Sequence, residues 1–269
     1  MTKARENSDY TGLQGDLALK SPVASPVFTG NVGVGATPES TNIHSSYTSV
    51  DISRGGAIAG HSAGNGIKIL GNAYRTTSGY AYKNTDKVSL YANDDGIHQF
   101  AVAASGTADA AISWNTAMMI DNAGRVTKPL QPAFLVSSNA EQSIQNTAHT
   151  YVDWQVEEYD INSDCSSGVF TAPVDGTYFF YTQLRLNSPD NAHDYIDLKI
   201  ETPNRDFREI TDFGNTSADP QYWTVQVTAV ARMDAGDTAR ARVYFSGGDN
   251  NTAISSDTPR TYFTGYLVA

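Results

Sequence analysis

The most regular pattern of hydrophobic and polar positions lies in the segment GTYFFYTQLRL, at residues 176–186. Successive side chains of a strand point to opposite faces, so alternate positions of this segment share a face. One face is mostly apolar and carries Tyr178, Phe180, Thr182, Leu184 and Leu186. The other face begins with Phe179 and Tyr181 and becomes polar at Gln183 and Arg185. The pattern predicts a strand whose second face is also covered along its first half.

Four further segments of the same half alternate in a similar way. They are PAFLVSS, YWTVQVTAVA, ARARVYF and RTYFTGYLVA, and the turn sequences NSPDN, DAGD and SGGDNN punctuate them. Strands at this spacing, with no helical period between them, predict an antiparallel sandwich or jelly roll. The last segment again has two apolar faces, which is typical of a subunit interface. We therefore expect an interface formed by Phe179, Tyr181, Tyr262 and Tyr266.

The first half of the chain has short apolar bursts in a background of Gly, Ala, Ser, Thr and Asn. Residues 1–29 contain two prolines and many small polar residues, which predicts an arm or linker. Residues 30–129 contain bursts such as SVDIS, GIKIL and KVSLYA, which predict short strands. This low apolar content leaves two alternatives, an irregular β domain or several copies that wrap together. The resulting division is an arm (1–29), a β-rich shaft (30–129) and a C-terminal domain (130–269).

The charge is unevenly distributed along the 269 residues. Residues 1–129 contain ten Lys or Arg and ten Asp or Glu, so the formal net charge of −11 belongs to residues 130–269. An acidic domain repels nucleic acid and anionic membranes, and no apolar run is long enough for membrane insertion. We expect this negative charge to keep the protein in solution, and binding of divalent cations is the more specific alternative role. The N-terminus shows no secretory signal, so we expect synthesis in a cytoplasm.

Candidate catalytic residues are sparse. Cys165 is the only cysteine, which excludes an intrachain disulfide and a cysteine-based zinc site. None of the five histidines lies in a Gly-x-Ser-x-Gly or His-Glu-x-x-His motif. Two carboxylates suffice for polysaccharide hydrolysis, but the neighbours Glu157 and Glu158 point to opposite faces of an expected strand unless a bulge intervenes. We expect a protein that is not an enzyme and requires no cofactor.

Four ordered segments of the C-terminal half resemble the globular head of the C1q family. The most specific is VFTAPVDGTYFF, which fits the Phe, five residues, Gly-x-Tyr-x-Phe pattern of that family at Phe170, Gly176, Tyr178 and Phe180. Support comes from AFLV at Phe134, from MDAGDTARARVYF, and from the closing TYFTGYLVA with its Phe-x-Gly-aromatic-Leu strand. The resemblance implies a ten-stranded jelly roll, shared with the tumour necrosis factor superfamily, and assembly as a homotrimer.

The first half resembles fibre proteins of tailed phages. LALKSPVASPVFTGNVGVGATPES resembles a short segment common in such fibres. YTSVDISRGG and HQFAVAASGTADAAISWNTAMMIDNAGRV are similar to a module of marine phage and cyanophage fibres. The resemblance implies a homotrimeric tail fibre of the virion, whose N-terminal arm docks to other tail proteins.

Loops held by a rigid scaffold are where recognition residues concentrate. Three loops of the C-terminal domain carry aromatic side chains that can stack on a sugar and polar ones that can bind its hydroxyls. The candidate receptor-binding residues are Asn187, Asp190, Asn191, His193, Asp194, Tyr222, Trp223, Asp249 and Asn250. Tyr222 and Trp223 have the alternative role of beginning a buried strand. Asp190, Asp194 and Asp249 also offer the oxygen ligands that calcium prefers, so calcium stays open as a bound ion.

The expected function is attachment of a virion to the host cell surface, through trimeric, multivalent adhesion to a polysaccharide or protein. Two alternatives remain at this point. The first is a structural or capsid-decorating fibre whose C-terminal domain serves trimerisation. The second is a polysaccharide depolymerase.

Overall fold

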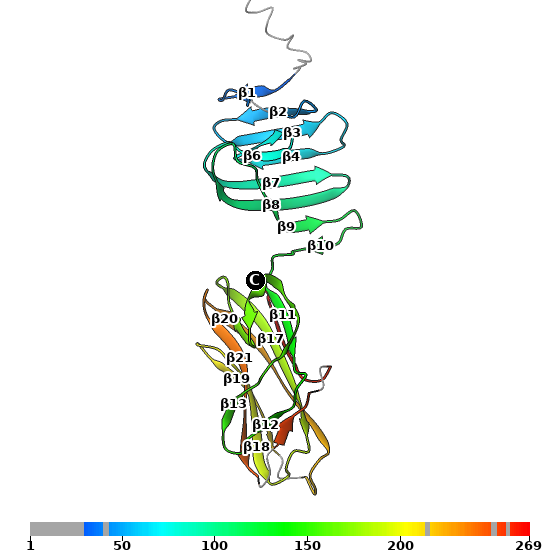
Figure 1. The fold of residues 1–269 in the computed structure, drawn as a ribbon, viewed down its shortest axis with the longest axis vertical. Coiled ribbons are helices and arrows are strands. Elements are labelled where there is room, and N and C mark those ends of the chain that lie inside the picture. Colours follow the sequence, from blue (N-terminus) through cyan, green and yellow to red (C-terminus); the bar gives the residue numbers. More distant parts are fainter. Residues whose placement is uncertain (1–29, 40–42, 213–215, 249–251, 257–258) are drawn as a thin grey trace, which may run out of the picture. The chain divides into compact units, whose positions relative to one another are not determined.

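The computed structural model describes residues 30–39, 43–212, 216–248, 252–256 and 259–269. The chain divides into two compact units, Met1–Lys128 and Pro129–Ala269, and each is described by itself (Figure 1). The arm predicted for residues 1–29 lies outside the described residues. The described elements are strands, apart from the short 3₁₀ turn η1 (Ile161–Ser163), so the prediction of an all-β protein is confirmed. Within the described part of the chain, no helix is long and apolar enough to cross a membrane.

The first unit consists of an eight-stranded sheet and a separate hairpin. The sheet contains, in spatial order, β1 (Val32–Val34), β2 (Tyr47–Ile52), β3 (Gly56–His61), β4 (Ile67–Gly71), β7 (Asp86–Asp94), β8 (Ile97–Gly106), β9 (Asn115–Ile120) and β10 (Val126–Thr127). The hairpin pairs β5 (Ala73–Thr76) with β6 (Gly79–Tyr82). Several strands that follow each other in sequence pair in antiparallel fashion through short turns. One example is the β7–β8 turn, where Asp95 and Gly96 both have positive φ, as a two-residue hairpin loop requires.

The core of the first unit is small and includes charged groups. Six of its ten buried apolar residues are alanines. In the SVDIS burst Asp51 is the buried residue, and its carboxylate pairs with Lys83. In GIKIL, Lys68 is buried on the same face as Leu70 and pairs with Asp94 at 2.6 Å. Alternation predicts two faces for each strand, but these buried ion pairs decide which face is covered. The covered face therefore differs from the one that hydrophobicity alone would select.

The second unit has two antiparallel sheets that share one core. The first sheet contains, in order, β12 (Gln142–Ile144), β22 (Thr252–Ile254), β17 (Gly176–Asn187), β23 (Tyr262–Leu267), β11 (Ala133–Ser137) and β14 (Val156–Asp160), and β20 (Tyr222–Met233) pairs with β17. The second sheet contains β15 (Cys165–Ser166), β16 (Val169–Thr171), β21 (Thr238–Gly247), β18 (His193–Glu201) and β19 (Asp206–Asp212), and β13 (His149–Tyr151) pairs with β21. The predicted jelly roll is confirmed.

The core of the second unit is built around aromatic rings. Tyr178 and Phe180, from the predicted inner face of β17, are fully buried. The ring of Phe134 lies 5.1 Å from that of Phe170 and 5.0 Å from that of Phe263, so four strands contribute to one cluster. Burial of each such ring stabilises the fold by about 1.5–3 kcal/mol. This cluster joins the two sheets into one rigid unit.

The entry segment and the first predicted binding loop lie at opposite ends of the second unit. Pro132, where the chain enters the unit, lies beside the last strand, because its carbonyl accepts a hydrogen bond from the Leu267 amide at 3.0 Å. The amide of Thr177, at the start of β17, donates to the carbonyl of Ala269 at 2.7 Å. β17 then runs for 12 residues to Asn187, where the first predicted binding loop begins. That loop therefore emerges at the end of the unit opposite the entry point, which we call the distal end (Figure 1).

Candidate functional site

The outer face of the first sheet in the second unit carries all four predicted interface residues. The rings of Phe179 and Tyr266 are 5.1 Å apart, and those of Tyr181 and Tyr262 are 5.6 Å apart. Val230, which is directly opposite Phe179 on β20, extends this aromatic stripe and is 59% exposed. The structure thus gathers the four predicted residues into one largely apolar surface of two ring pairs.

The polar border of this stripe is provided by glutamines. The Tyr181 hydroxyl donates a hydrogen bond to Oε1 of Gln226 at 2.7 Å, and Gln183 lies in the same row of the sheet. Burial and the neighbouring Tyr262 hydroxyl raise the pKa of Tyr181 to about 12. The stripe consists of Phe, Tyr and Val side chains, so its burial against another subunit would carry no cost for desolvating an ion.

A second feature of the same face concerns the two neighbouring carboxylates. The pairing of β11 with β14 shifts register between Leu135 and Val136, which places a bulge at Glu158. Glu157 and Glu158 therefore do not follow simple alternation, and both side chains are exposed. The Glu158 carboxylate accepts a hydrogen bond from the Ser137 hydroxyl at 3.0 Å. The bulge that the sequence left open as an exception to alternation is therefore present.

The three predicted loops converge at the distal end. The amide of Asn191 donates to the Asp219 carboxylate at 2.9 Å, and the amide of Ser188 donates to the carbonyl of Gln221 at 2.9 Å. These bonds join the loop after β17 to the loop before β20. The ring of His193 lies within hydrogen-bond distance of the Gly247 carbonyl, at 3.0 Å, which joins the third loop. The distal end is therefore one continuous surface built from three connections.

Two predicted binding residues are buried within this surface. His193 is 1% exposed, and its second ring nitrogen contacts the Thr252 hydroxyl at 2.9 Å. Asp190 is 4% exposed, and its carboxylate accepts the Ala192 amide at 2.8 Å. Both side chains are buried and hold the loop together, and their contact with a receptor stays a prediction. A polar residue that bonds its own loop has the same sequence signature as one that faces solvent.

The other predicted residues differ in their exposure. Asn187 and Asn191 are half-buried, and the Asn187 amide donates to the Glu141 carboxylate at 2.8 Å. Asp194 is exposed, and the Ser246 hydroxyl donates to its carboxylate at 3.1 Å. Asp249 and Asn250 lie outside the described residues. Among the described residues, no three His, Cys, Asp or Glu side chains gather as metal ligands would.

Tyr222 lies in a shallow pocket that sequence reasoning found only in part. The pocket is lined by Arg185, Tyr222, Trp223, Thr224 and Arg260. The Arg185 guanidinium lies 3.9 Å from the centroid of the Tyr222 ring, and Tyr222 remains 52% exposed. Trp223 is half-buried and packs against the core, so the strand-start alternative holds for it. The two arginines were missed because they lie far apart in sequence and the fold alone brings them together.

A second stack of Arg on Tyr lies on the outer face of the other sheet. There the Arg240 guanidinium lies 3.6 Å from the centroid of the Tyr151 ring, and Arg240 also pairs with Glu201 at 3.2 Å. This stack was not predicted either, although Arg240 and Arg242 alternate along β21. It provides a matched control for the Tyr222 pocket.

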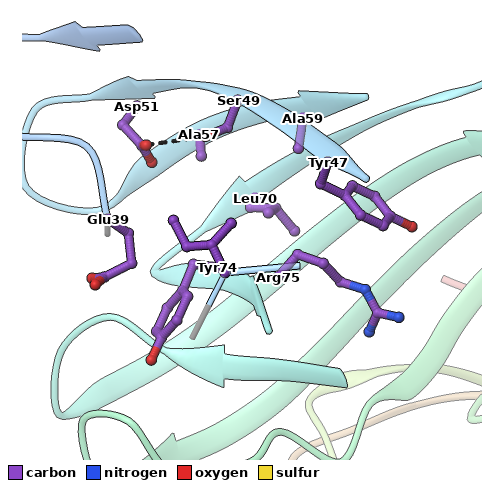
Figure 2. A pocket seen from close by; sticks show the side chains of 10 residues that line it. Glu39, Tyr47, Ser49, Asp51, Ala57, Ala59, Leu70, Tyr74 and Arg75 are labelled. Atoms are coloured by element: carbon purple, nitrogen blue, oxygen red, sulfur yellow. Dashed lines mark hydrogen bonds between the residues drawn. The ribbon is translucent and has the colours of Figure 1, made fainter. Parts of the chain in front are cut away.

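A small cavity in the first unit lies between the sheet and the β5–β6 hairpin. Figure 2 shows Leu70, Tyr74 and the chain of Arg75 around it, with Asp51 on the far side. Its volume is about 20 Å³, which is room for a single water molecule. The cavity is therefore a packing feature of the unit and not a site for an organic ligand.

Two antiparallel sheets around an aromatic core, with an apolar outer stripe and joined loops at one end, define a jelly-roll domain. Residues 133–268, half of the chain, match the family model of the C1q domain, and the chain belongs to this family. Domains of the C1q type typically form homotrimers and generally act in binding or trimerisation.

The chain is also similar to solved structures, at low sequence identity. The globular domain of the zebrafish complement 1qA protein is 20% identical, with a TM-score of 0.36, and the match covers 52% of this chain and 98% of that chain. Murine APRIL at pH 8.0 is 15% identical, with a TM-score of 0.38, and the match covers 51% of this chain and 99% of that chain. No curated protein sequence matches the chain.

Proposed function

We propose that this protein is a homotrimeric tail-fibre or receptor-binding protein of a tailed phage, and that its C1q unit attaches the virion to the host surface. The observation that carries the proposal is the convergence of three loops at the distal end, opposite the point where the chain enters the unit. The fibre-like segments in the first half of the sequence support the phage assignment. The arm would dock to other tail proteins, which leaves the distal end facing the host.

The chemistry of the distal end fits a saccharide or a polar protein surface. The exposed Tyr222 ring offers a flat face beside the Arg185 guanidinium, and Asp194 offers an exposed carboxylate for hydroxyl groups. A cation–π contact contributes about 0.5–1 kcal/mol at an exposed site, so a single site of this kind is weak. Three such weak sites in a trimer combine through effective concentration into avidity 10²–10⁴-fold above a single site, by order of magnitude. Adhesion of this kind needs no catalytic group and no cofactor, and calcium would be an addition.

A second candidate is a structural fibre in which the C1q unit chiefly holds three chains together. The aromatic stripe of Phe179, Tyr181, Tyr262 and Tyr266 favours this role, because it is suited to assembly and makes no use of the distal loops. The two candidates share the trimer and differ in whether the distal surface binds the host. They are separated by an experiment on that surface.

The experiment measures binding of the fluorescent full-length chain to a panel of marine bacteria and cyanobacteria by flow cytometry. Tyr222→Ala should reduce binding to a responsive strain at least tenfold. Tyr151→Ala, which removes the matched Arg–Tyr stack on the other sheet, should leave binding within twofold of the wild type. Native mass spectrometry must show the same trimer for both variants. If the wild-type trimer binds no strain of the panel, or if both variants bind equally well, adhesion through this pocket is rejected.

The trimer interface is tested on the same chain. Phe179→Asp places three carboxylates in the stripe, so we expect dissociation of the C1q units at micromolar concentration with unchanged β-sheet content by circular dichroism. Ile210→Asp is the control, because Ile210 is 56% exposed on the outer face of the other sheet. A trimer that survives Phe179→Asp as well as it survives Ile210→Asp would exclude the stripe as the interface.

A further inference from the structure

The eight-stranded sheet of the first unit carries an unbroken row of apolar side chains on one face. The pairing registers place each residue of the row directly opposite the next, from β2 across the sheet to β9. We call this set the outer row, and it consists of Val50, Ile58, Ile69, Tyr91, Phe100 and Met118. Cross-strand neighbours on one face lie within side-chain contact, so the row forms a continuous apolar ridge.

The rows on both sides of this ridge are also nearly free of charge. The other strand positions on the face that carries the ridge are occupied by Ile, Val, Gly, Ser, Thr, Ala, Asn and His. Among the described strands, Lys87 near the start of β7 is the one charged residue on this face. The Tyr91 hydroxyl lies 2.8 Å from Nδ1 of His98, so its polar atom has a partner within the face. In an antiparallel sheet with one face in water, the residues of each strand that point to the water are normally polar. The residues on this exposed face are mostly apolar.

The exposure of this face is large for a surface that meets only water. Eight of its apolar residues are between 38% and 54% exposed, namely Val34, Val50, Ile52, Ile58, Ile67, Ile69, Phe100 and Val102. Together they expose on the order of 600 Å², which is at the upper end of the largest apolar patch of a typical monomer. The opposite face is covered by the β5–β6 hairpin, which contributes Ala73 and Tyr82 to the core. One face of the sheet therefore has a cover within the chain, and the outer row has none among the described residues.

The length of the connection between the units identifies the occupant. Five residues separate β10 from β11, a reach of about 17 Å at full extension. A C1q unit that assembles as a trimer therefore holds three copies of the first unit at millimolar effective concentration, by order of magnitude. Charge does not oppose their approach, because residues 1–129 have equal numbers of acidic and basic side chains. The nearest apolar partner for the outer row is the outer row of another copy.

We propose that the outer rows of three copies pack against one another around the threefold axis, so that the first unit forms a three-sided shaft with an apolar interior. Stable interfaces bury about 800 Å² per partner, so the exposed apolar area alone is marginal for association of free units. The proposal rests on the trimer of the C1q unit, whose tether supplies the missing driving force. It assigns the shaft a second trimer interface, chemically distinct from the aromatic stripe.

Cysteine cross-linking tests this assignment in the full-length chain. Ile69→Cys places a thiol in the middle of the outer row, and Thr77→Cys places one in the exposed β5–β6 turn, on the covered side of the sheet. The native Cys165 does not interfere, because it is buried and burial raises the pKa of its thiol to about 12. With a short bismaleimide, we expect Ile69→Cys to give covalent dimers at least fivefold faster than Thr77→Cys. The rate should be unchanged between 0.1 and 10 µM protein, since the reaction occurs within one trimer.

The outcomes separate this inference from the proposed function. Equal cross-linking of the two variants in an intact trimer overturns the shaft interface, whether or not the chain binds host cells. A monomeric wild type by native mass spectrometry overturns it as well. Rapid, concentration-independent cross-linking of Ile69→Cys supports the interface even if no host strain is bound. As a second measurement, Ile69→Asp should lower the thermal midpoint of the trimer by more than 5 °C relative to Thr77→Asp, and an equal midpoint for the two variants counts against the proposal.

Discussion

Gly265 of β23 is tightly enclosed by the aromatic core. It is directly opposite Phe134 on β11 and Phe180 on β17, so both rings lie over the position that a side chain would occupy. A Cβ atom at Gly265 would lie 2.4 Å from Cδ1 of Phe180 and 2.9 Å from Cε1 of Phe134. Both rings are fully buried and have little room to move. This packing explains why a residue without a side chain occupies the Gly position of the Phe-x-Gly-aromatic-Leu strand.

Gly265→Ala should therefore destabilise the C1q unit through overpacking. Ordinary contacts with a Cβ atom are 3.4–4 Å long, so the Phe180 ring must retreat by about 1 Å, and overpacking of this kind costs about 1–3 kcal/mol. For a unit of this size the loss corresponds to a fall of about 3–10 °C in the thermal midpoint. The assay is urea unfolding at one fixed protein concentration, followed by tryptophan fluorescence and circular dichroism.

A double-mutant cycle with Phe180→Leu identifies the cause. Replacing the ring with a smaller side chain opens the space that the new methyl group needs, so Gly265→Ala should cost less in the Phe180→Leu background. We expect a coupling free energy of about 1 kcal/mol or more, within the range measured for residues in contact. Additive effects of the two substitutions, or a Gly265→Ala variant as stable as the wild type, would refute the proposed clash.

Four further outcomes are expected. Burial raises the pKa of the Cys165 thiol to about 12, so Ellman's reagent should label native protein slowly and urea-unfolded protein at once. The folded pKa of this thiol lies above its ordinary value of 9.0, so the contribution of the protonated thiol to the free energy of unfolding is complete below pH 9 and is lost between about pH 9 and 12. A pH series of urea midpoints would show this loss. Arg208→Gln leaves the buried Asp197 carboxylate without its ion-pair partner and should cost about 1–3 kcal/mol; an unchanged urea midpoint contradicts this. Gly168→Ala combines a positive φ of 73° with a Cβ position 2.0 Å from the Trp154 ring, so it should lower the thermal midpoint and alter tryptophan emission, and unchanged emission argues against the contact.

The sequence allowed the inner faces of the C1q unit to be predicted because its strands alternate over long, regular stretches. In β17 the buried residues are those that alternation selects, from Tyr178 to Leu186. The aromatic stripe followed from the same reasoning, since Phe179 and Tyr266 stand out as apolar residues on the remaining face. A period of two residues is a strong signal when one strand spans 12 residues.

The parts that could not be predicted depend on contacts between distant segments. In the first unit, alternation in SVDIS does not reveal that Asp51 is buried, because its partner Lys83 lies 32 residues away. In the distal loops, burial of His193 depends on Thr252, and the pocket depends on the approach of Arg260 to Arg185. Only the folded chain brings these groups together, so their roles were not readable from local pattern.

The pairing of β17 with β20 has a mechanical consequence. The two strands are in register over 12 residue pairs, from Gly176 opposite Met233 to Asn187 opposite Tyr222. A pull between the distal loops and the entry segment at Pro132 would act along the strands, so the ladder of hydrogen bonds would be loaded in shear. All of the bonds would then share the force, whereas a pull across the strands would open them one after another. The direction of these strands should therefore help the C1q unit to resist unfolding when force is applied between the distal loops and the entry segment.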